Sequence, residues 1–209
     1  MLCATPLGRG YANSPGITAK PARSLTPLLC VGMRSSDKTM AIIREESPND
    51  RAAVREVNIR AFGQAVEADL VDALRENSAG LLSLVAVKDG QVVAHILFSP
   101  ATIGADDNTV EGMGLAPMAV LPDYQQQGIG SELVRAGIAR LTSTACPFVI
   151  MRGHPHYYPR FGFEPASRRG IRSEWEVPDE AFMILVLDDE LMRELSGVAR
   201  YRPAFTAAL

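Results

Sequence analysis

Three segments of the chain repeat apolar residues at the three- and four-residue spacing of an amphipathic helix. The apolar positions that share a face are Val54, Val57, Ala61 and Phe62 in the first segment, Leu70, Val71 and Leu74 in the second, and Ile129, Leu133, Val134, Ile138 and Leu141 in the third. Before the first segment, Ser47, Pro48 and Asp50 supply a polar cap, an early proline and an acid near the positive helix end. We therefore predict helices that begin near residues 48, 64 and 128.

Extended apolar runs lie between these segments and predict strands. The runs cover 41–43, both halves of 81–103, 110–122, 147–153 and 180–189. Asp89-Gly90 divides 81–103 as a tight hairpin turn would, and 154–165 reads as a short turn or helical piece. The predicted order is β-α-α-β-β-β-α-β-α-β, which indicates a mixed α/β fold. Its central sheet is antiparallel first, partly parallel later, and flanked by helices.

The first 39 residues lack this periodicity and differ in composition from the rest of the chain. They contain Arg9, Lys20, Arg23, Arg34 and Lys38 but only one acid, together with frequent Ser, Thr, Pro and Gly. We interpret 1–39 as a disordered or mis-started leader, with residue 40 as the working start. A basic transit peptide for organellar import is the alternative. Residues 40–209 are enough for one domain with a full core.

Composition and charge argue against several classes of protein. The net charge of −3 gives no general affinity for nucleic acid or an anionic membrane. No apolar run approaches the roughly 20 residues of a membrane span, and no His, Cys or carboxylate group has metal-ligand spacing. Cys3, Cys30 and Cys146 form no CxxC pair, which favours free thiols in a reducing compartment. We expect a cytoplasmic protein that uses no metal.

The segment LPDYQQQGIGSELV, residues 121–134, places two glycines at the start of the third helix. The first amides of a helix lack intrahelical acceptors, and the helix dipole makes that end positive. Glycines let an anion approach such amides closely. A Rossmann reading fails because the third glycine position is Leu133, and no Gly-Lys-Ser/Thr follows for a Walker loop. An ordinary glycine-tolerant helix start is the alternative to a phosphate site.

These residues carry a resemblance to a known family. MAVLPDYQQQGIGSELV resembles the Gln/Arg-x-x-Gly-x-Gly/Ala motif of the GNAT superfamily of acyl-CoA-dependent N-acyltransferases. GHPHYYPRFGFEPASRRGI and WEVPDEAFMILVL are similar to the YhbS-like group of predicted acetyltransferases. The resemblance covers roughly 41–205, and the predicted order of elements matches the GNAT order.

The resemblance implies acetyl-CoA as the cosubstrate and assigns residues to it. The pyrophosphate would lie on the amides from Gln126 to Ser131, and the pantetheine arm would pair with the strand that ends at Val120. The residues so assigned are Met118, Ala119, Val120, Gln125, Gln126, Gln127, Gly128, Ile129, Gly130 and Ser131. Gln126 stands where many relatives have a basic residue, so phosphate affinity would rest more on amides here.

Tyr158 matches the position of the family's usual general acid, because its spacing to Gly162-Phe163 is that of the family. A phenol whose pKa is near 10 holds its proton at neutral pH and can protonate a departing thiolate. The alternative is that Tyr157 and Tyr158 are both packing residues. The candidates for a general base are His95, Glu111, His154 and His156, and the sequence does not select among them.

The resemblance implies an N-acetyltransferase that moves an acetyl group from acetyl-CoA to an amine by direct attack. A non-catalytic acyl-CoA-binding regulatory module is the main alternative, and a pure protein-interaction domain a weaker one. The acceptor is a small-molecule amine, a protein amino group or an acyl-carrier-type partner, and its site is expected between the first two helices and 165–205. Arg152 either lies at a sheet edge or faces an acidic acceptor. Exposed strand edges are compatible with a homodimer.

Overall fold

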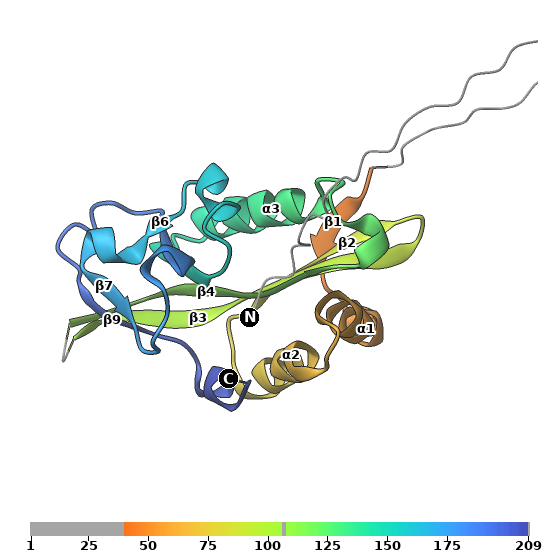
Figure 1. Ribbon diagram of the computed structural model, residues 1–209, viewed down its shortest axis with the longest axis horizontal. Helices are drawn as coiled ribbons and strands as arrows, with labels where there is room; N and C mark the ends of the chain where they lie inside the picture. Colours follow the sequence, from red (N-terminus) through yellow and green to blue (C-terminus); the bar gives the residue numbers. More distant parts are fainter. Residues whose placement is uncertain (1–39, 106–107, 209) are drawn as a thin grey trace, which may run out of the picture.

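The computed structural model describes residues 40–105 and 108–208, whose strands form one nine-stranded sheet; the predicted leader 1–39 lies outside them (Figure 1). The strands are β1 (Ile42–Glu45), β2 (Leu82–Lys88), β3 (Gln91–Ala105), β4 (Asn108–Val120), β5 (Phe148–Arg152), β6 (Glu164–Pro165), β7 (Ile171–Ser173), β8 (Phe182–Val186) and β9 (Gly197–Arg200). Their main order is β1-β2-β3-β4-β5-β8-β6, with β9 paired to both β3 and β7.

Strands β1 to β4 pair antiparallel, and β5 then joins β4 in parallel. The turn between β2 and β3 has positive φ at Asp89 (51°) and Gly90 (79°), the backbone that a two-residue hairpin requires. A parallel pair needs a long crossover connection, and helix α3 (Ile129–Ser143) provides it between β4 and β5. The predicted mixed sheet is therefore confirmed.

Helices cover both faces of the sheet. Helices α1 (Arg51–Phe62) and α2 (Val66–Asn77) lie on one face, which we call the α1–α2 face, and α3 lies on the other, the α3 face (Figure 1). The 3₁₀ turn Pro48–Asp50 precedes α1, and Ser47 and Asp50 form a capping box at the start of that turn, in which the Ser47 amide donates to the Asp50 carboxylate at 2.7 Å. Gly63, in the left-handed region at φ 75°, ends α1.

The alternation of side chains along the strands separates two apolar layers. On the α3 face, Ile96 of β3 and Met151 of β5 pack with Leu133 of α3. On the α1–α2 face, Leu97 of β3 packs with Leu74 of α2. The α3 backbone approaches the sheet closely, because a Cβ at Gly137 would lie 2.3 Å from the ring of Phe98.

The prediction was incomplete at the C-terminal side of the chain. The strands β6, β7 and β9 were not predicted, because they are two to four residues long and have no apolar run. The helical piece expected in 154–165 is a single 3₁₀ turn, Tyr158–Phe161. In the described part of the chain no helix is long and apolar enough to cross a membrane. Nor do three or more metal-ligating side chains gather there.

Candidate functional site

Strands β4 and β5 pair over only three residues and then diverge. Met113 to Leu115 pair with Val149 to Met151, whereas β4 continues to Val120 without a β5 partner. On its other side the register with β3 shifts, since Ile96 faces Met118 but Phe98 faces Leu115. Three steps along β4 therefore match two along β3, so β4 carries an extra residue there. As a result, β4 has an open edge beside the segment that leads into α3.

Backbone alternation shows which residues of β4 face that open edge. The Leu121 amide donates to the Val93 carbonyl at 2.9 Å, so Leu121 and, two residues earlier, Ala119 face β3. Met118 and Val120 consequently direct their amides and carbonyls toward the divergence. The Val120 carbonyl accepts a bond from Gln125 Nε2 at 3.0 Å. Of the three strand residues assigned to acetyl-CoA, Ala119 is thus the one whose backbone groups pair with β3.

The start of α3 lies next to this edge and presents unpaired amides. Gly128 is the N-cap at φ 90°, and Gln126 also has a positive φ of 60°. The first bond within the helix runs from the Glu132 amide to the Gly128 carbonyl at 3.0 Å. The amides of 129–131 therefore have no intrahelical acceptor, and they stand at the positive end of the helix dipole. This geometry suits an anion.

A cavity of about 360 Å³ joins the helix start to the open edge. It is lined by Met118, Val120, Tyr124, Gln125, Gln126, Gly128, Ile129, Gly130, Ser131, Tyr157 and Arg160. Two of the residues assigned to acetyl-CoA, Ala119 and Gln127, do not line it. The Gln127 side chain donates instead to the Asp123 carbonyl at 2.9 Å and accepts from Lys88 at 3.3 Å.

Two lining residues that the sequence did not assign to acetyl-CoA come from the turn after β5. The Tyr157 hydroxyl is 3.2 Å from Ser131 Oγ, and it is equally far from the place of a Cβ at Gly130. The Arg160 guanidinium lies over the Tyr157 ring, 4.8 Å from its centroid. Arg160 therefore brings a positive charge to the cavity from a distant part of the chain. No local signal beside the glycine-rich helix start could have found it, because the two segments meet only in the folded chain.

The predicted acid Tyr158 lies in the same 3₁₀ turn but points elsewhere. Its side chain is fully buried and packs edge-on against the rings of Tyr157 at 5.0 Å and Phe163 at 5.6 Å. A Cβ at Gly153 would come within 2.9 Å of the Tyr158 ring. Because Gly153 directly follows β5, Tyr158 stands at the end of the strand that diverges from β4.

Among the candidate bases, His95 takes part in a buried hydrogen-bond network. Its Nδ1 lies 3.2 Å from Asn58 Nδ2, and its Nε2 lies 3.0 Å from Ser83 Oγ. Asn58 Nδ2 also donates to a backbone carbonyl one turn earlier at 2.9 Å. With the amide in that orientation, Nδ1 accepts and Nε2 carries the proton.

Burial, assisted by the charge of Arg75, keeps His95 neutral. Burial and, to a smaller extent, the nearby Arg75 together lower its pKa to about 3. The Ser83 hydroxyl donates to Glu46, which also pairs with Arg75. With both ring nitrogens engaged, His95 is a structural residue and not a base for an incoming amine. Ser83 is likewise no activated nucleophile.

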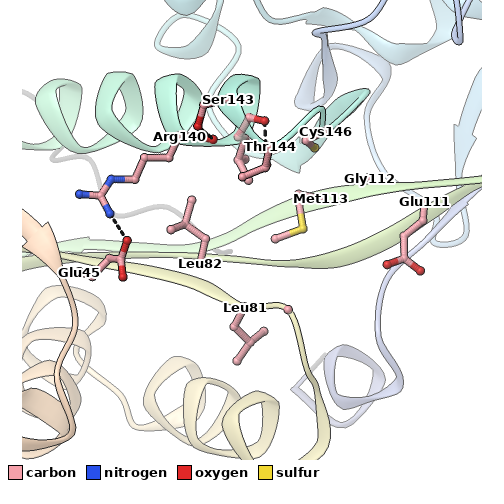
Figure 2. Close-up of a pocket in the computed structure, with 12 residues that line it drawn as sticks. Glu45, Leu81, Leu82, Glu111, Gly112, Met113, Arg140, Ser143, Thr144 and Cys146 are labelled. Atoms are coloured by element: carbon pink, nitrogen blue, oxygen red, sulfur yellow. Dashed lines mark hydrogen bonds and ion pairs between the residues drawn. The ribbon is translucent and has the colours of Figure 1, made fainter.

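A larger cavity of about 600 Å³ lies toward the other end of α3, between that helix and the sheet (Figure 2). Arg140 of α3 and Glu45 of β1 form an ion pair beside it, and the candidate base Glu111 lies on its wall. The Cys146 thiol there donates to the Phe148 carbonyl at 3.1 Å, and burial raises the pKa of that thiol. Glu111 is therefore away from the divergence of β4 and β5, and Cys146 is not a reactive thiolate.

The other two candidate bases follow β5. The His154 carbonyl accepts the Tyr157 amide at 3.0 Å, and the His156 carbonyl accepts from Arg160 at 3.2 Å. His154 is partly buried, whereas His156 is exposed. Both backbones shape the turn that carries Tyr157 and Tyr158.

Residues 51–163 match a family model described as the acetyltransferase (GNAT) family. The chain is 34% identical over 165 residues to the uncharacterized N-acetyltransferase YhbS of Escherichia coli (strain K12), which covers 78% of this chain and 98% of that protein. It is 43% identical over 135 residues to the uncharacterized N-acetyltransferase YjhQ of the same strain, covering 63% of this chain and 75% of that protein.

Two solved structures share both fold and sequence with the chain. The GNAT family N-acetyltransferase YhbS from Escherichia coli, in complex with CoA, has a TM-score of 0.75 and 34% identity, covering 80% of this chain and 93% of that one. A GNAT family acetyltransferase from Brucella melitensis, in complex with acetyl-CoA, has a TM-score of 0.64 and 36% identity, covering 79% and 97%.

Proposed function

Because this chain belongs to the acetyltransferase (GNAT) family, we propose that it transfers an acetyl group from acetyl-CoA to an amine acceptor by direct attack. The observation that carries the proposal is the cavity in which the start of α3 meets the open edge of β4. Relatives above 30% identity were solved with CoA and with acetyl-CoA, which supports the same ligand here.

The helix start fits a pyrophosphate. Three amides lack intrahelical acceptors, and the helix dipole favours negative charge at that place. Gly128 leaves open space, since no atom lies within 4 Å of the position its Cβ would take. Ser131 adds a hydroxyl, and Arg160 supplies the positive charge that Gln126 lacks. We infer that these groups hold the phosphates of acetyl-CoA.

The open edge of β4 fits the pantetheine arm, whose amides can pair with a strand as another strand would. Met118 and Val120 offer backbone groups toward that edge, whereas Ala119 does not. An amide on this edge would donate to the thioester oxygen and stabilise the negative charge that develops there during attack. Contacts of this type act through preorganised donors, and a strand held by β3 on its other side is such a donor.

Proton transfer is assigned to Tyr158. The neutral amine nitrogen forms the new bond to the acetyl carbon, the carbon–sulfur bond breaks, and the sulfur leaves as a thiolate. Tyr158 stands at the end of β5, beside the divergence, and would give its phenolic proton to that thiolate. The amine loses its surplus proton to solvent or to a base, for which His154 is the candidate nearest in sequence to the end of β5.

The test of the site is a matched pair of glycine substitutions. Gly128 and Gly63 both have a positive φ, 90° and 75°, and at both positions a Cβ meets no atom within 4 Å. The variants Gly128→Glu and Gly63→Glu therefore share the backbone cost and differ only in the place of the new carboxylate. Repulsion between a carboxylate and a phosphate about 4 Å apart is on the order of a few kcal/mol. Gly128→Glu should therefore weaken acetyl-CoA binding at least about 100-fold.

Calorimetric titration of the whole chain with acetyl-CoA and with CoA provides the measurement. Gly63→Glu should bind both ligands as the unchanged protein does. Retained affinity in folded Gly128→Glu would show that the pyrophosphate lies elsewhere. Absence of binding to the folded, unchanged protein would remove the proposed function altogether.

The proposal also covers the class of acceptor and the cellular compartment. We infer that the acceptor is a small-molecule or protein amine and that nucleic acid and membranes are not partners, given the net charge of −3. The unpaired Cys146 supports a reducing compartment, for which the cytoplasm is our choice. Exposed sheet edges allow a homodimer.

A further inference from the structure

Buried polar atoms without a hydrogen-bond partner gather on one face of the sheet. In the described part of the chain these side-chain atoms are Asn58 Oδ1, Ser99 Oγ, Tyr201 Oη and Arg202 Nε. Asn58 belongs to α1, Ser99 to β3, and Tyr201 and Arg202 to the segment that leads under α2. All of them lie on the α1–α2 face. Unpaired buried groups are costly, so each one is a candidate contact for a polar ligand or a water molecule.

Ser99 and Tyr201 border the same residue of β4. Ser99 is paired with Gly114, and a Cβ at Gly114 would lie 2.4 Å from the Tyr201 ring. Trp175 stacks on that ring, with centroids 5.3 Å apart and planes at 26°. Tyr201 is therefore held rigidly beneath β4, just before the strand diverges from β5.

Arg152 reaches the same place from β5. Gly114 is paired with Ile150, and Arg152 follows two residues later, so all three side-chain positions share the α1–α2 face. Arg152 is also the first residue beyond the last pair between β4 and β5. No ion pair of the described residues includes its guanidinium.

The influences on the pKa of Tyr201 agree with a position of Arg152 close to its hydroxyl. Burial raises the pKa of the Tyr201 hydroxyl, Glu174 raises it further, and Arg152 lowers it. The Tyr201 hydroxyl is therefore a neutral donor. Glu174 is exposed, and one of its oxygens already accepts the Tyr201 amide at 2.7 Å. The guanidinium of Arg152 thus has a full positive charge for which the described part of this face offers no ion-pair partner.

We propose that Ser99, Arg152 and Tyr201, the Arg152–Tyr201 cluster, bind an oxyanion carried by the amine acceptor, either a carboxylate or a phosphate. The inference rests on the proposed function, in which the phosphates of acetyl-CoA occupy the α3 face and leave the α1–α2 face to the acceptor. A planar guanidinium with a hydroxyl beside it is the donor set that such anions prefer.

The register also limits the length of the acceptor. Extending the register of β4 and β5 by one residue would put Arg152 level with residue 116, whereas the open amides begin at Met118, about 7 Å further along β4 at about 3.3 Å per residue. The amine and the oxyanion should therefore be separated by a short chain of three or four carbons. A small amine that bears a carboxylate and one that bears a phosphate both meet this length limit, and the two kinds are compared below.

The test uses two pairs of amines that differ only in the anionic group. The probes are 4-aminobutyrate with 4-aminobutanamide, and 3-aminopropyl phosphate with 3-aminopropanol. Acetyl-CoA-dependent thiol release is measured for the full chain, for Arg152→Met, and for Arg193→Met, an exposed arginine outside the cluster. The unchanged protein should prefer the anionic member of a pair in kcat/KM by about 10- to 100-fold. Arg152→Met should abolish that preference, and Arg193→Met should retain it.

Tyr201→Phe separates ligand binding from structure. Because the hydroxyl has no partner, its removal should leave the melting temperature unchanged or raised. It should raise KM for the anionic amine by roughly 3- to 10-fold. A lowered melting temperature with unchanged KM would assign the hydroxyl to a buried water instead and overturn its place in the cluster.

The remaining outcomes decide the proposal. A higher kcat/KM for the anionic member of the carboxylate pair or of the phosphate pair supports the proposal and identifies which anion is bound. Equal losses for charged and neutral amines in Arg152→Met overturn it, as does preference for the neutral amines. Failure to acetylate any of the four amines, with normal acetyl-CoA binding, overturns the acceptor class but leaves the proposed function standing. Absence of acetyl-CoA binding removes both.

Discussion

Replacing Tyr158 by phenylalanine should remove the departing thiolate's proton donor and leave the surrounding packing in place. The ring is fully buried and touches Tyr157, Phe161 and Phe163 edge-on, at centroid distances of 5.0, 6.3 and 5.6 Å. Phenylalanine keeps every one of those ring contacts. The stability cost is then limited to one hydroxyl, roughly 0.5–3 kcal/mol.

The expected kinetic effect is much larger than the effect on folding. A positioned general acid contributes about 10²- to 10⁴-fold, so kcat should fall by that factor, or about 2.7–5.4 kcal/mol in the barrier. Affinity for acetyl-CoA should stay within about twofold, because Tyr158 does not line the cavity at the start of α3. Thiol release gives the rate, and calorimetric titration gives the affinity.

Tyr157→Phe is the matched control, at the N-cap of the same 3₁₀ turn. Its hydroxyl is 3.2 Å from Ser131 Oγ and borders the cavity, so we expect a role in binding. Loss of one hydrogen bond of about 0.5–1.5 kcal/mol should weaken acetyl-CoA about 2- to 12-fold and leave kcat nearly unchanged. The reverse pattern, with the large kcat loss in Tyr157→Phe, would refute the assignment of the acid. No turnover in the unchanged protein would favour a non-catalytic acyl-CoA-binding module.

Two further predictions concern the scaffold. Gly137→Ala would bring a Cβ within 2.3 Å of the Phe98 ring, so the free energy of unfolding in urea should fall by about 1–3 kcal/mol; an unchanged value would show that α3 can shift. The pKa of His95 is about 3 in the folded state, below its ordinary value near 6.5, so the unfolded chain binds more protons between those values. Stability should therefore be full above pH 6.5 and fall by up to about 1.4 kcal/mol per pH unit below it. His95→Gln should flatten that slope, whereas the exposed His156→Gln should keep it.

The start of α3 could be predicted because its determinants are local. A glycine N-cap, a second glycine and a helical apolar stripe all lie within 128–141, and the structure places the helix there. The hairpin at Asp89-Gly90 follows from the same kind of short-range constraint. Such features depend on backbone preferences of a few adjacent residues, which tertiary packing here did not overrule.

The features of the site that local sequence did not predict depend on strand register and on segments that are distant in the chain. Ala119 turns toward β3 only because of where the pairing shift falls, which no pattern in 110–122 reveals. Two adjacent tyrosines in a 3₁₀ turn necessarily point in different directions, and spacing alone did not show that Tyr157 is the one that reaches the cavity. Arg160 arrives from another part of the chain. One of the two partners of β9 is β3, about a hundred residues earlier, so this pairing left no local signal.

The Arg152–Tyr201 cluster can be tested through two glycines that lie on the same face of β4. At Gly114 a Cβ would lie 2.4 Å from the Tyr201 ring, and at Gly112 it would lie 2.7 Å from the Phe148 ring. Neither has a positive φ, so both alanine variants add overpacking without backbone strain, about 1–3 kcal/mol each. Only Gly114→Ala displaces a member of the Arg152–Tyr201 cluster. It should raise KM for an anionic amine severalfold while acetyl-CoA affinity stays the same, and Gly112→Ala should leave both unchanged. If Gly114→Ala weakened acetyl-CoA instead, the cofactor would cross to the α1–α2 face, and the division of the sheet between cofactor and acceptor would be wrong.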